Sequence, residues 1–281
     1  MKMSRMIVLA SALMAMAIPT VRADSLYVTT SKGDFGTLDT ATGSFAQIGA
    51  SNAALINGAG LGFGSNGTLY TMTDYGLGIA LETIDTSTGI LTLIGDTGLH
   101  DYPSNDITSY GLATTSDGTL YAYRGDTSHA TKIFQIDPTT AAPTLIGIAG
   151  VTIEGAFQGD DSGRLFATGG NIGGSYPSSN GVFQIDPATG GGMLLGNSDV
   201  GTAYALGFVN HRMYAFTPTG SIYLVDLSNG QGTFVANYDA AKIGYIEGAA
   251  AASSQAVPEP ASLAMLGLGG AGLALVRRRK K

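Results

Sequence analysis

The 281-residue chain contains no cysteine and no tryptophan. Without thiols it has no disulfide bond, no thiolate nucleophile and no cysteine-ligated metal, so its stability must come from a buried core. The missing indoles count mildly against a sugar-stacking lectin, although 13 tyrosines could take their place. The three histidines, His100, His129 and His211, do not occupy matching positions in the repeats described below. No histidine metal site is therefore predicted.

Sequence signatures of common enzymes are also missing. The chain has no Gly-x-Ser-x-Gly elbow, no His-Glu-x-x-His pair and no phosphate-binding loop. The adjacent acids Asp160 and Asp161 could hold Ca²⁺, but the alternating acids of an EF-hand loop are absent, which favours a solvated turn. We therefore predict neither a metal nor a cofactor.

Basic residues are scarce in the body of the chain and concentrated at its ends. Near the N-terminus, Lys2 and Arg5 precede an apolar stretch over residues 6–18, and Ala23 follows at a position that signal peptidase reads. We predict a signal peptide over residues 1–23, cleaved after Ala23. Residues 24–257 then carry six basic and 20 acidic side chains, a net charge of −14. Such a surface repels phosphate backbones, so nucleic acid is not an expected partner.

The C-terminus combines three features in order. Val257 and the box Pro258-Glu259-Pro260 precede an apolar run over residues 261–276, and the chain closes with five basic residues, Arg277, Arg278, Arg279, Lys280 and Lys281. The prolines prevent a helix from beginning before the apolar run. As a helix the run spans about 24 Å, somewhat short for a bilayer core of about 30 Å. The basic cluster is expected to stay in the cytoplasm.

This tail resembles the PEP-CTERM sorting signal of Gram-negative bacteria. The resemblance implies transient anchoring in the inner membrane, cleavage near the Pro-Glu-Pro box by an exosortase, and delivery to the cell surface or the extracellular space. The family's link with exopolysaccharide producers also implies a role in the surface matrix or biofilm. An ordinary C-terminal membrane anchor is the alternative interpretation. The resemblance concerns destination and does not imply an activity.

The body repeats one unit five times. Each unit has a short strand with an aromatic residue, and these residues recur at intervals of 43 to 51 positions: Tyr27, Tyr70, Tyr121, Phe166 and Tyr214. A second strand in each unit ends in an aspartate: Asp39, Asp85, Asp137, Asp186 and Asp226. After Asp85 and Asp186 the chain continues as an Asp-x-x-Thr-Gly turn, in which the aspartate can accept bonds from backbone N–H groups. Four strands in such a unit are typical of a β-propeller blade. The recurring aspartates are interpreted as turn-building residues.

The order of strands predicts how the ring closes. The first unit lacks its opening strand, and an additional strand over residues 245–252 follows the last unit. We expect this strand to become the innermost strand of the first blade. The prediction is an all-β, five-bladed propeller over residues 24–252, a linker over 253–257 and a sorting tail over 258–281. An open β-solenoid or sandwich is the alternative. The repeats also resemble uncharacterised secreted propeller-type proteins, which imply no activity.

Aligned opening strands place five residues around the predicted channel, each followed by a small residue: Ala59, Tyr110, Glu154, Tyr204 and Glu247. Three interpretations remain open for them. Glu154 and Glu247 could act as general acid and base on a glycosidic bond, as in a carbohydrate-active hydrolase or lyase. The carboxylates and phenols could instead bind a cation or sugar hydroxyls, or the glutamates could have a structural role. We favour a non-enzymatic binding or structural role.

The long loops differ between the units and are expected to carry recognition. They span residues 52–58, 100–109 and 171–181, and are rich in Ser, Thr, Gly and Asn. Three loop tyrosines could stack on sugars: Tyr75, Tyr102 and Tyr176. Anchoring of the loop is the alternative role for each.

Overall fold

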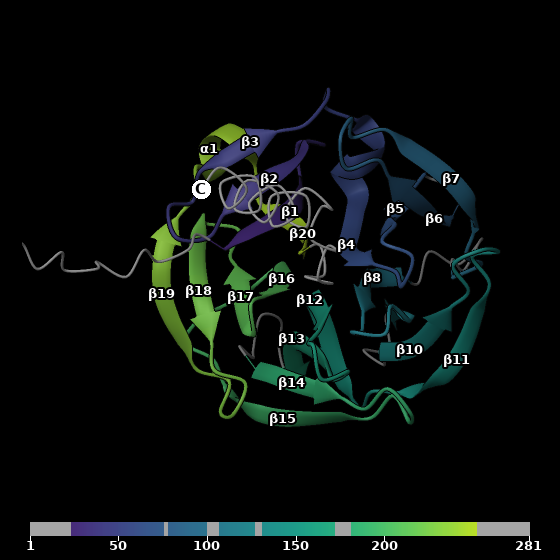
Figure 1. Ribbon diagram of the computed structural model, residues 1–281. Helices are drawn as coiled ribbons and strands as arrows, with labels where there is room; N and C mark the ends of the chain where they lie inside the picture. Colours follow the sequence, from purple (N-terminus) through teal and green to yellow (C-terminus); the bar gives the residue numbers. More distant parts are fainter. Residues whose placement is uncertain (1–23, 76–77, 100–106, 127–130, 172–180, 252–281) are drawn as a thin grey trace, which may run out of the picture.

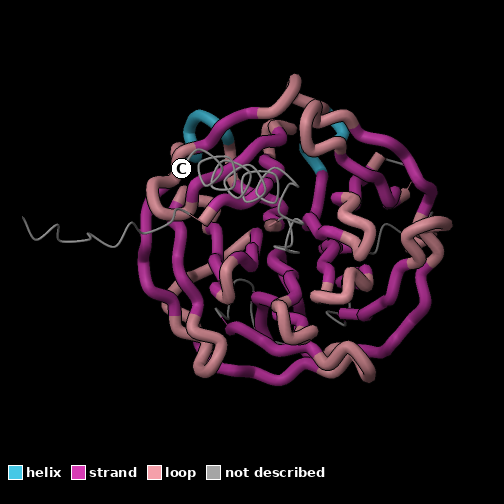
Figure 2. The backbone as a smooth tube through the Cα atoms, in the orientation of Figure 1, coloured by secondary structure: helices cyan, strands magenta, loops and turns pink. Residues whose placement is uncertain are grey.

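The computed structural model describes residues 24–75, 78–99, 107–126, 131–171 and 181–251. Five antiparallel sheets of four strands each surround a central axis (Figure 1). Figure 2 shows how strands dominate, with short helical segments only at the 3-10 helix η1 (Ala53–Asn57) and at α1 (Ala240–Ile243) among the described residues. The all-β, five-bladed propeller is thereby confirmed.

Each blade is one sheet, whose strands follow one another from the central axis outward. Blade I consists, from the innermost strand to the outermost, of β20 (Ile246–Ala250), β1 (Ser25–Thr30), β2 (Phe35–Asp39) and β3 (Phe45–Gln47). In the same order, blade II consists of β4 (Gly58–Phe63), β5 (Leu69–Asp74), β6 (Ile79–Ile84) and β7 (Leu91–Asp96). Blade III consists of β8 (Ile107–Thr114), β9 (Leu120–Asp126), β10 (Thr131–Ile136) and β11 (Pro143–Ile148).

The last two blades follow the same plan. Blade IV consists of β12 (Val151–Gly159), β13 (Leu165–Asn171), β14 (Gly181–Ile185) and β15 (Gly192–Asn197). Blade V consists of β16 (Ala205–Val209), β17 (Arg212–Phe216), β18 (Ser221–Val225) and β19 (Gly232–Asn237). Every predicted unit thus forms the four-stranded sheet that its sequence pattern indicates.

The ring closes as predicted, by pairing the two ends of the domain. In β20, Ala250, Ala249 and Gly248 lie opposite residues 27, 28 and 29 of β1. The closing strand occupies residues 246–250, within the expected range 245–252. Asp24 adds a second tie, since its buried carboxylate accepts hydrogen bonds from the Tyr214 hydroxyl at 2.7 Å and the Asn210 amide at 2.6 Å.

The hydrophobic core lies between neighbouring blades. Apolar side chains alternate along the strands, so each sheet presents them on the faces that meet the next blade. Leu26 and Leu38 of blade I share one fully buried cluster with Phe216 of blade V. Met72 of blade II shares another with Leu112 of blade III. Five such clusters, one at each blade boundary, hold the ring together without disulfide support.

The antiparallel order gives the ring two different faces. Connections from the first to the second and from the third to the fourth strand of each blade lie at one end, which we call the turn face: residues 40–44, 64–68, 85–90, 115–119, 137–142, 160–164, 186–191, 210–211 and 226–231. All other connections lie at the opposite end, the loop face. The longest of these connections span residues 48–57, 97–106 and 172–180, of which 100–106 and 172–180 lie outside the described residues.

The turn face consists of repeated tight turns. Oδ1 of Asp85 accepts from the backbone N–H groups of Ser87 at 2.8 Å and Thr88 at 2.9 Å, and the equivalent aspartates of the other blades do the same with their own turn amides. Hydrogen bonds from a serine or threonine hydroxyl of the same turn, together with the backbone bonds, lower the pKa of four of these aspartates: Asp85, Asp137, Asp186 and Asp226. Their role as turn-building residues is therefore confirmed.

Both ends of the described domain lie on the turn face. β1 runs from the turn face to the loop face, and β20, its antiparallel partner, runs back and ends at Ala250. The predicted signal peptide (1–23), linker (253–257) and sorting tail (258–281), with the hydrophobic helix expected over 261–276, lie outside the described residues. Within the described part of the chain, no helix is long and apolar enough to cross a membrane.

Candidate functional site

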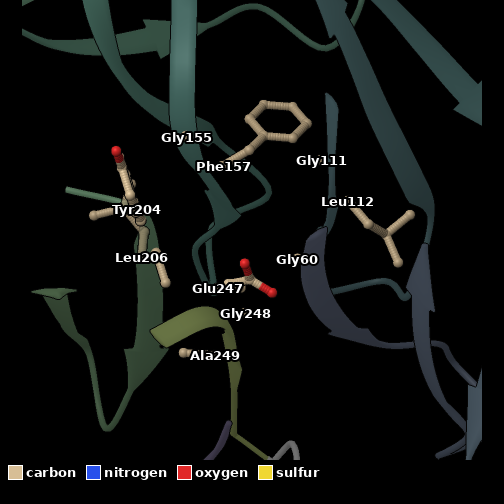
Figure 3. Close-up of a pocket in the computed structure, with 11 residues that line it drawn as sticks. Gly60, Gly111, Leu112, Gly155, Phe157, Tyr204, Leu206, Glu247, Gly248 and Ala249 are labelled. Carbon is tan, nitrogen blue, oxygen red and sulfur yellow. The ribbon is translucent and has the colours of Figure 1, made fainter. Parts of the chain in front are cut away.

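The five innermost strands surround a narrow central hollow that has essentially no room for a water molecule. Its lining includes the small residues that the alignment of opening strands predicts: Gly60, Gly111, Gly155, Ala205 and Gly248 (Figure 3). Gly60 shows why such residues are needed, because its φ is +76° and an added Cβ would come within 2.2 Å of the Leu112 carbonyl oxygen. Close approach of the inner strands therefore leaves little free space along the axis.

Glu247 places its carboxyl group in the middle of this hollow (Figure 3). The residue forms a β-bulge, since the pair Thr29 and Gly248 is followed by the pair Thr30 and Ile246, which leaves Glu247 without a partner across the sheet. Its Oε2 atom is buried and finds no hydrogen-bond partner among the described residues. Burial raises the pKa of this carboxyl to about 8, so Glu247 is mainly neutral at pH 7.

Tyrosines surround the carboxyl group on the loop-face side. Tyr204 lines the hollow, and its ring meets that of Tyr245 edge to face, with centroids 5.0 Å apart. Burial raises the pKa of Tyr110, and the negative charges of Asp74 and Glu247 add to this effect. Burial, Glu247 and Tyr204 likewise raise the pKa of Tyr245. The structure thus places Tyr204 and Glu247 in the lining of one hollow, and the charge of Glu247 acts on Tyr110 and Tyr245.

The other two predicted ring positions differ from Glu247. Glu154 lies in β12, in a wider bulge where Ile153 and Phe157 oppose residues only two apart on β13. The side chain of Glu154 lies outside the described part of the structure. Ala59 of β4 is half-buried and offers no polar group.

Two residues of the site escape the sequence alignment. Tyr245 precedes β20 and lies two positions before Glu247, so strand alternation alone could have placed it beside the same mouth. Gln158 is 4% exposed and reaches across the channel from β12, where its Nε2 donates to the Ala249 carbonyl at 2.6 Å. Its Oε1 accepts from the Gly159 N–H at 2.9 Å. No sequence pattern marks this bond, because it joins the inner strands of two non-adjacent blades.

The remaining candidates lie in turns or outside the described residues. His211 is exposed, contacts the Asp161 carboxylate through Nδ1, and has a φ of +61° in place of the expected turn glycine. Asp160 is paired with the Arg164 guanidinium at 2.6 Å, which supports the turn interpretation over a calcium site. No group of three or more potential metal-ligating side chains occurs within the described ranges.

The loop aromatics are only partly described. Tyr75 is 49% exposed and donates a hydrogen bond from its hydroxyl to Asp96 at 3.0 Å. This bond fits anchoring of the loop, although the exposed ring face remains accessible. His100, His129, Tyr102 and Tyr176 lie outside the described residues.

The fold and site define an all-β, five-bladed propeller with a nearly closed channel and no described catalytic cluster. Residues 256–280 match the family described as the PEP-CTERM protein-sorting motif. The chain therefore carries this motif, which implies an exported protein sorted by an exosortase-type enzyme, as the C-terminal pattern predicts.

Two further comparisons accompany this match. No curated protein matches the chain. Among solved structures, the chain is similar to TolB from Acinetobacter baumannii, with a TM-score of 0.49 and 11% sequence identity. The similarity covers 82% of this chain and 66% of that one.

Proposed function

We propose that the propeller is displayed at the cell surface with its loop face outward, as a non-enzymatic binding or structural protein of the surface matrix. The observation that carries this proposal is the direction of β20, which ends at Ala250 on the turn face, shortly before the sorting motif at residues 256–280. A chain held in the inner membrane through residues 261–276 would keep its turn face toward the lipid. The loop face would then point away from the membrane.

Exopolysaccharide is the partner that we favour for the loop face. The body carries a net charge of −14, which disfavours polyanions and is compatible with neutral or cationic sugars. The longest connections and the half-buried tyrosines at the channel mouth belong to this face. Unequal loops on a rigid ring are a common arrangement for recognition.

The alternative of a carbohydrate-active hydrolase or lyase using Glu154 and Glu247 receives less support. The hollow has essentially no room for even a water molecule, whereas pockets for small molecules typically have about 300–1,000 Å³. The Oε2 atom of Glu247 is also buried, so a polymer on the loop face would not reach it without rearrangement. A binding or structural role therefore fits the geometry better.

Orientation can be tested with cysteine labelling, because the chain has no native cysteine. Ala241→Cys places an exposed thiol on the loop face and Ser87→Cys an exposed thiol on the turn face. In an exosortase-deficient strain, where the tail keeps its anchor, a bulky maleimide-polymer reagent should label Ala241→Cys faster. After detergent solubilisation the two variants should be labelled at similar rates. Equal labelling rates of the two variants in intact membranes would contradict the proposed orientation.

Binding is tested by size-exclusion chromatography with light scattering. The mature protein, recovered from the producing cells, is mixed with the producer's own exopolysaccharide. Co-elution with polymer of unchanged mass supports the proposed role, and substitutions on the loop face such as Tyr75→Ala should weaken it more than Asp226→Ala on the turn face. A falling polymer mass would favour the enzyme alternative, and separate elution would contradict binding.

A further inference from the structure

The closing strand β20 is short, and a bulge interrupts its pairing. It forms four pairs with β1, and the register shifts at Glu247, in the middle of the strand. A bulged residue contributes no cross-strand pair and locally disrupts the ladder. This blade is held together by pairing between the two ends of the domain, because β20 and β1 are far apart in the sequence and no chain connection joins them directly. Anything that weakens β20 therefore weakens closure of the whole ring.

The carboxyl group at the bulge has surroundings that suit a neutral acid and not an ion. Apolar and small residues from the other four inner strands line its hollow: Gly60, Leu112, Phe157 and Leu206 among them. An ion without donors in such a site is costly, whereas a protonated carboxyl costs far less. Oε2 has no donor among the described residues, although it is buried.

The titratable and charged groups around Glu247 come from four strands and their approaches. They are Tyr110 on β8, Tyr204 before β16 and Tyr245 before β20, with Arg124 of β9 opposite Tyr110 in register. Glu154 holds the matching sequence position on β12, and its side chain lies outside the described part of the structure. Phenols are neutral at physiological pH, so of the described groups only Arg124 carries positive charge. Burial, and not a neighbouring charge, dominates the behaviour of Glu247.

We propose that β20 is a pH-sensitive clasp, which stays in the ring while Glu247 is protonated and separates from β1 increasingly often as the pH rises. The other attachments of β20 are independent of pH. They include its backbone ladder with β1 and the hydrogen bond from Gln158 to Ala249. These contacts favour the paired form of β20 at every pH, and the protonation state of Glu247 shifts the equilibrium between the paired and the separated form. The proposal does not depend on what the loop face binds.

Opening of the clasp would change access to the sorting motif. The match to this motif begins at residue 256, six positions after the end of β20. Release of five strand residues adds roughly 17 Å of extended chain between the ring and the motif. A membrane-embedded exosortase would then meet the Pro-Glu-Pro box on a longer tether. Closure of the ring and processing of the tail would be coupled through one carboxyl group.

The direction of the effect follows from proton linkage. The carboxyl has a pKa of about 8 in the closed ring and an ordinary value once the strand is released and solvated. The closed form therefore holds the proton more tightly, and raising the pH favours the open form. Opening should increase by up to ~10-fold per pH unit between about pH 5 and 8, and level off above that range.

Hydrogen–deuterium exchange on the full-length protein in detergent micelles tests the clasp. Peptides covering 243–251 and 25–30 are followed from pH 5 to 9 in the wild type, Glu247→Gln and Glu82→Gln. Glu82 is the matched control, because it is a half-buried strand glutamate whose carboxylate accepts a hydrogen bond from Thr73 at 2.8 Å. At each pH, the exchange rate of a peptide is divided by the rate of the same peptide in Glu247→Gln. This ratio removes the intrinsic pH dependence of amide exchange.

Exchange of these peptides in the wild type and in Glu82→Gln should rise relative to Glu247→Gln, by on the order of a hundredfold between pH 5 and 8. A constant ratio across this range would overturn the proposal. Carbon NMR of the labelled Glu247 carboxyl in the wild type provides a second test that needs no variant. A titration midpoint near that of an ordinary glutamate would overturn the proposal as well.

Discussion

The two faces of the ring join antiparallel strands in different ways. Connections on the turn face have two to six residues, and the five between the third and fourth strands repeat one aspartate-based turn, whereas those on the loop face have two to ten residues and share no repeated motif. Repetition on the turn face reflects the demands of blade construction. The unequal connections, the coupled tyrosines and Glu247 lie on or toward the loop face. Architecture and candidate function are thus separated along the axis of the ring.

The largest expected effect on stability concerns a turn-face glycine of blade III that lies against the neighbouring blade II. Gly118 has a φ of +80°, and an added Cβ would lie 2.0 Å from the Ser65 backbone nitrogen of blade II. Gly118→Ala should lower the free energy of unfolding by about 4 kcal/mol, from backbone strain and the clash together. Chemical denaturation measures this change.

Gly163→Ala is the matched control. Gly163 has a φ of +82° in the equivalent turn of blade IV, but an added Cβ would meet nothing within 4 Å. We expect a loss of only about 1.5 kcal/mol, because the backbone strain remains without the clash. Equal losses for the two substitutions would show that inter-blade contact at the turn face contributes little.

The pH dependence of stability should distinguish the two regions by its sign. Glu247 has a raised pKa of about 8, so its contribution is present at low pH and is lost as the pH rises from about 5 to 8. We expect a loss of roughly 3 kcal/mol over this window, after allowing for partial solvent screening. Thermal or denaturant unfolding across the window should show this slope in the wild type and a nearly flat profile in Glu247→Gln.

The turn-face aspartates should respond in the opposite direction. The pKa of Asp85 is lowered by hydrogen bonds from Ser87 and Thr88, so its stabilising effect is present at neutral pH and is lost as the pH falls through the acid range. Asp85→Asn should flatten the acid side of the stability profile and leave the window between pH 5 and 8 unchanged. A change in that window instead would remove the distinction between the two regions.

A smaller effect is expected at the tie between the N-terminal residue of the domain and blade V. Asp24→Ala leaves the buried Tyr214 hydroxyl without its 2.7 Å acceptor, which should cost about 2 kcal/mol. Asp85→Ala removes a carboxylate that bonds only to an exposed turn, so a smaller loss than for Asp24→Ala is expected. Calorimetry at neutral pH measures both, and a larger loss for Asp85→Ala would contradict this ranking.

The smallest effect is expected at an exposed residue of the loop face. Tyr75→Phe removes the hydroxyl that donates to Asp96 at 3.0 Å, in a position open to solvent. Water can replace this bond, so the free energy of unfolding should not change measurably. A loss as large as that of Asp24→Ala, measured in the same denaturation experiments, would give this loop a structural role comparable to the turn face.

The repeats made most of the architecture predictable. The recurring aromatics and aspartates placed the strands and turns of every blade, and the unmatched strand near residue 245 predicted ring closure. The alignment of small residues also located the ring around the channel. Gln158 and the bulges were not predicted, because bulges and hydrogen bonds between non-adjacent blades leave no periodic signal in the sequence. Tyr245 was missed although strand alternation from Glu247 could have placed it at the channel mouth.

Glu154 and Glu247 show which features depend on local sequence and which depend on tertiary structure. Both occur in the sequence Ile-Glu-Gly-Ala, and from sequence alone they are equivalent. In the structure, Glu247 forms a bulge with one additional residue on the closing strand, whereas Glu154 lies in a bulge with two additional residues in an internal blade. Local sequence determines that a carboxylate, a small residue and a strand occur at each position, because these depend on side-chain type and spacing. Burial and hydrogen bonding of the carboxyl group depend on all five inner strands meeting at the axis, and only the closed ring decides them.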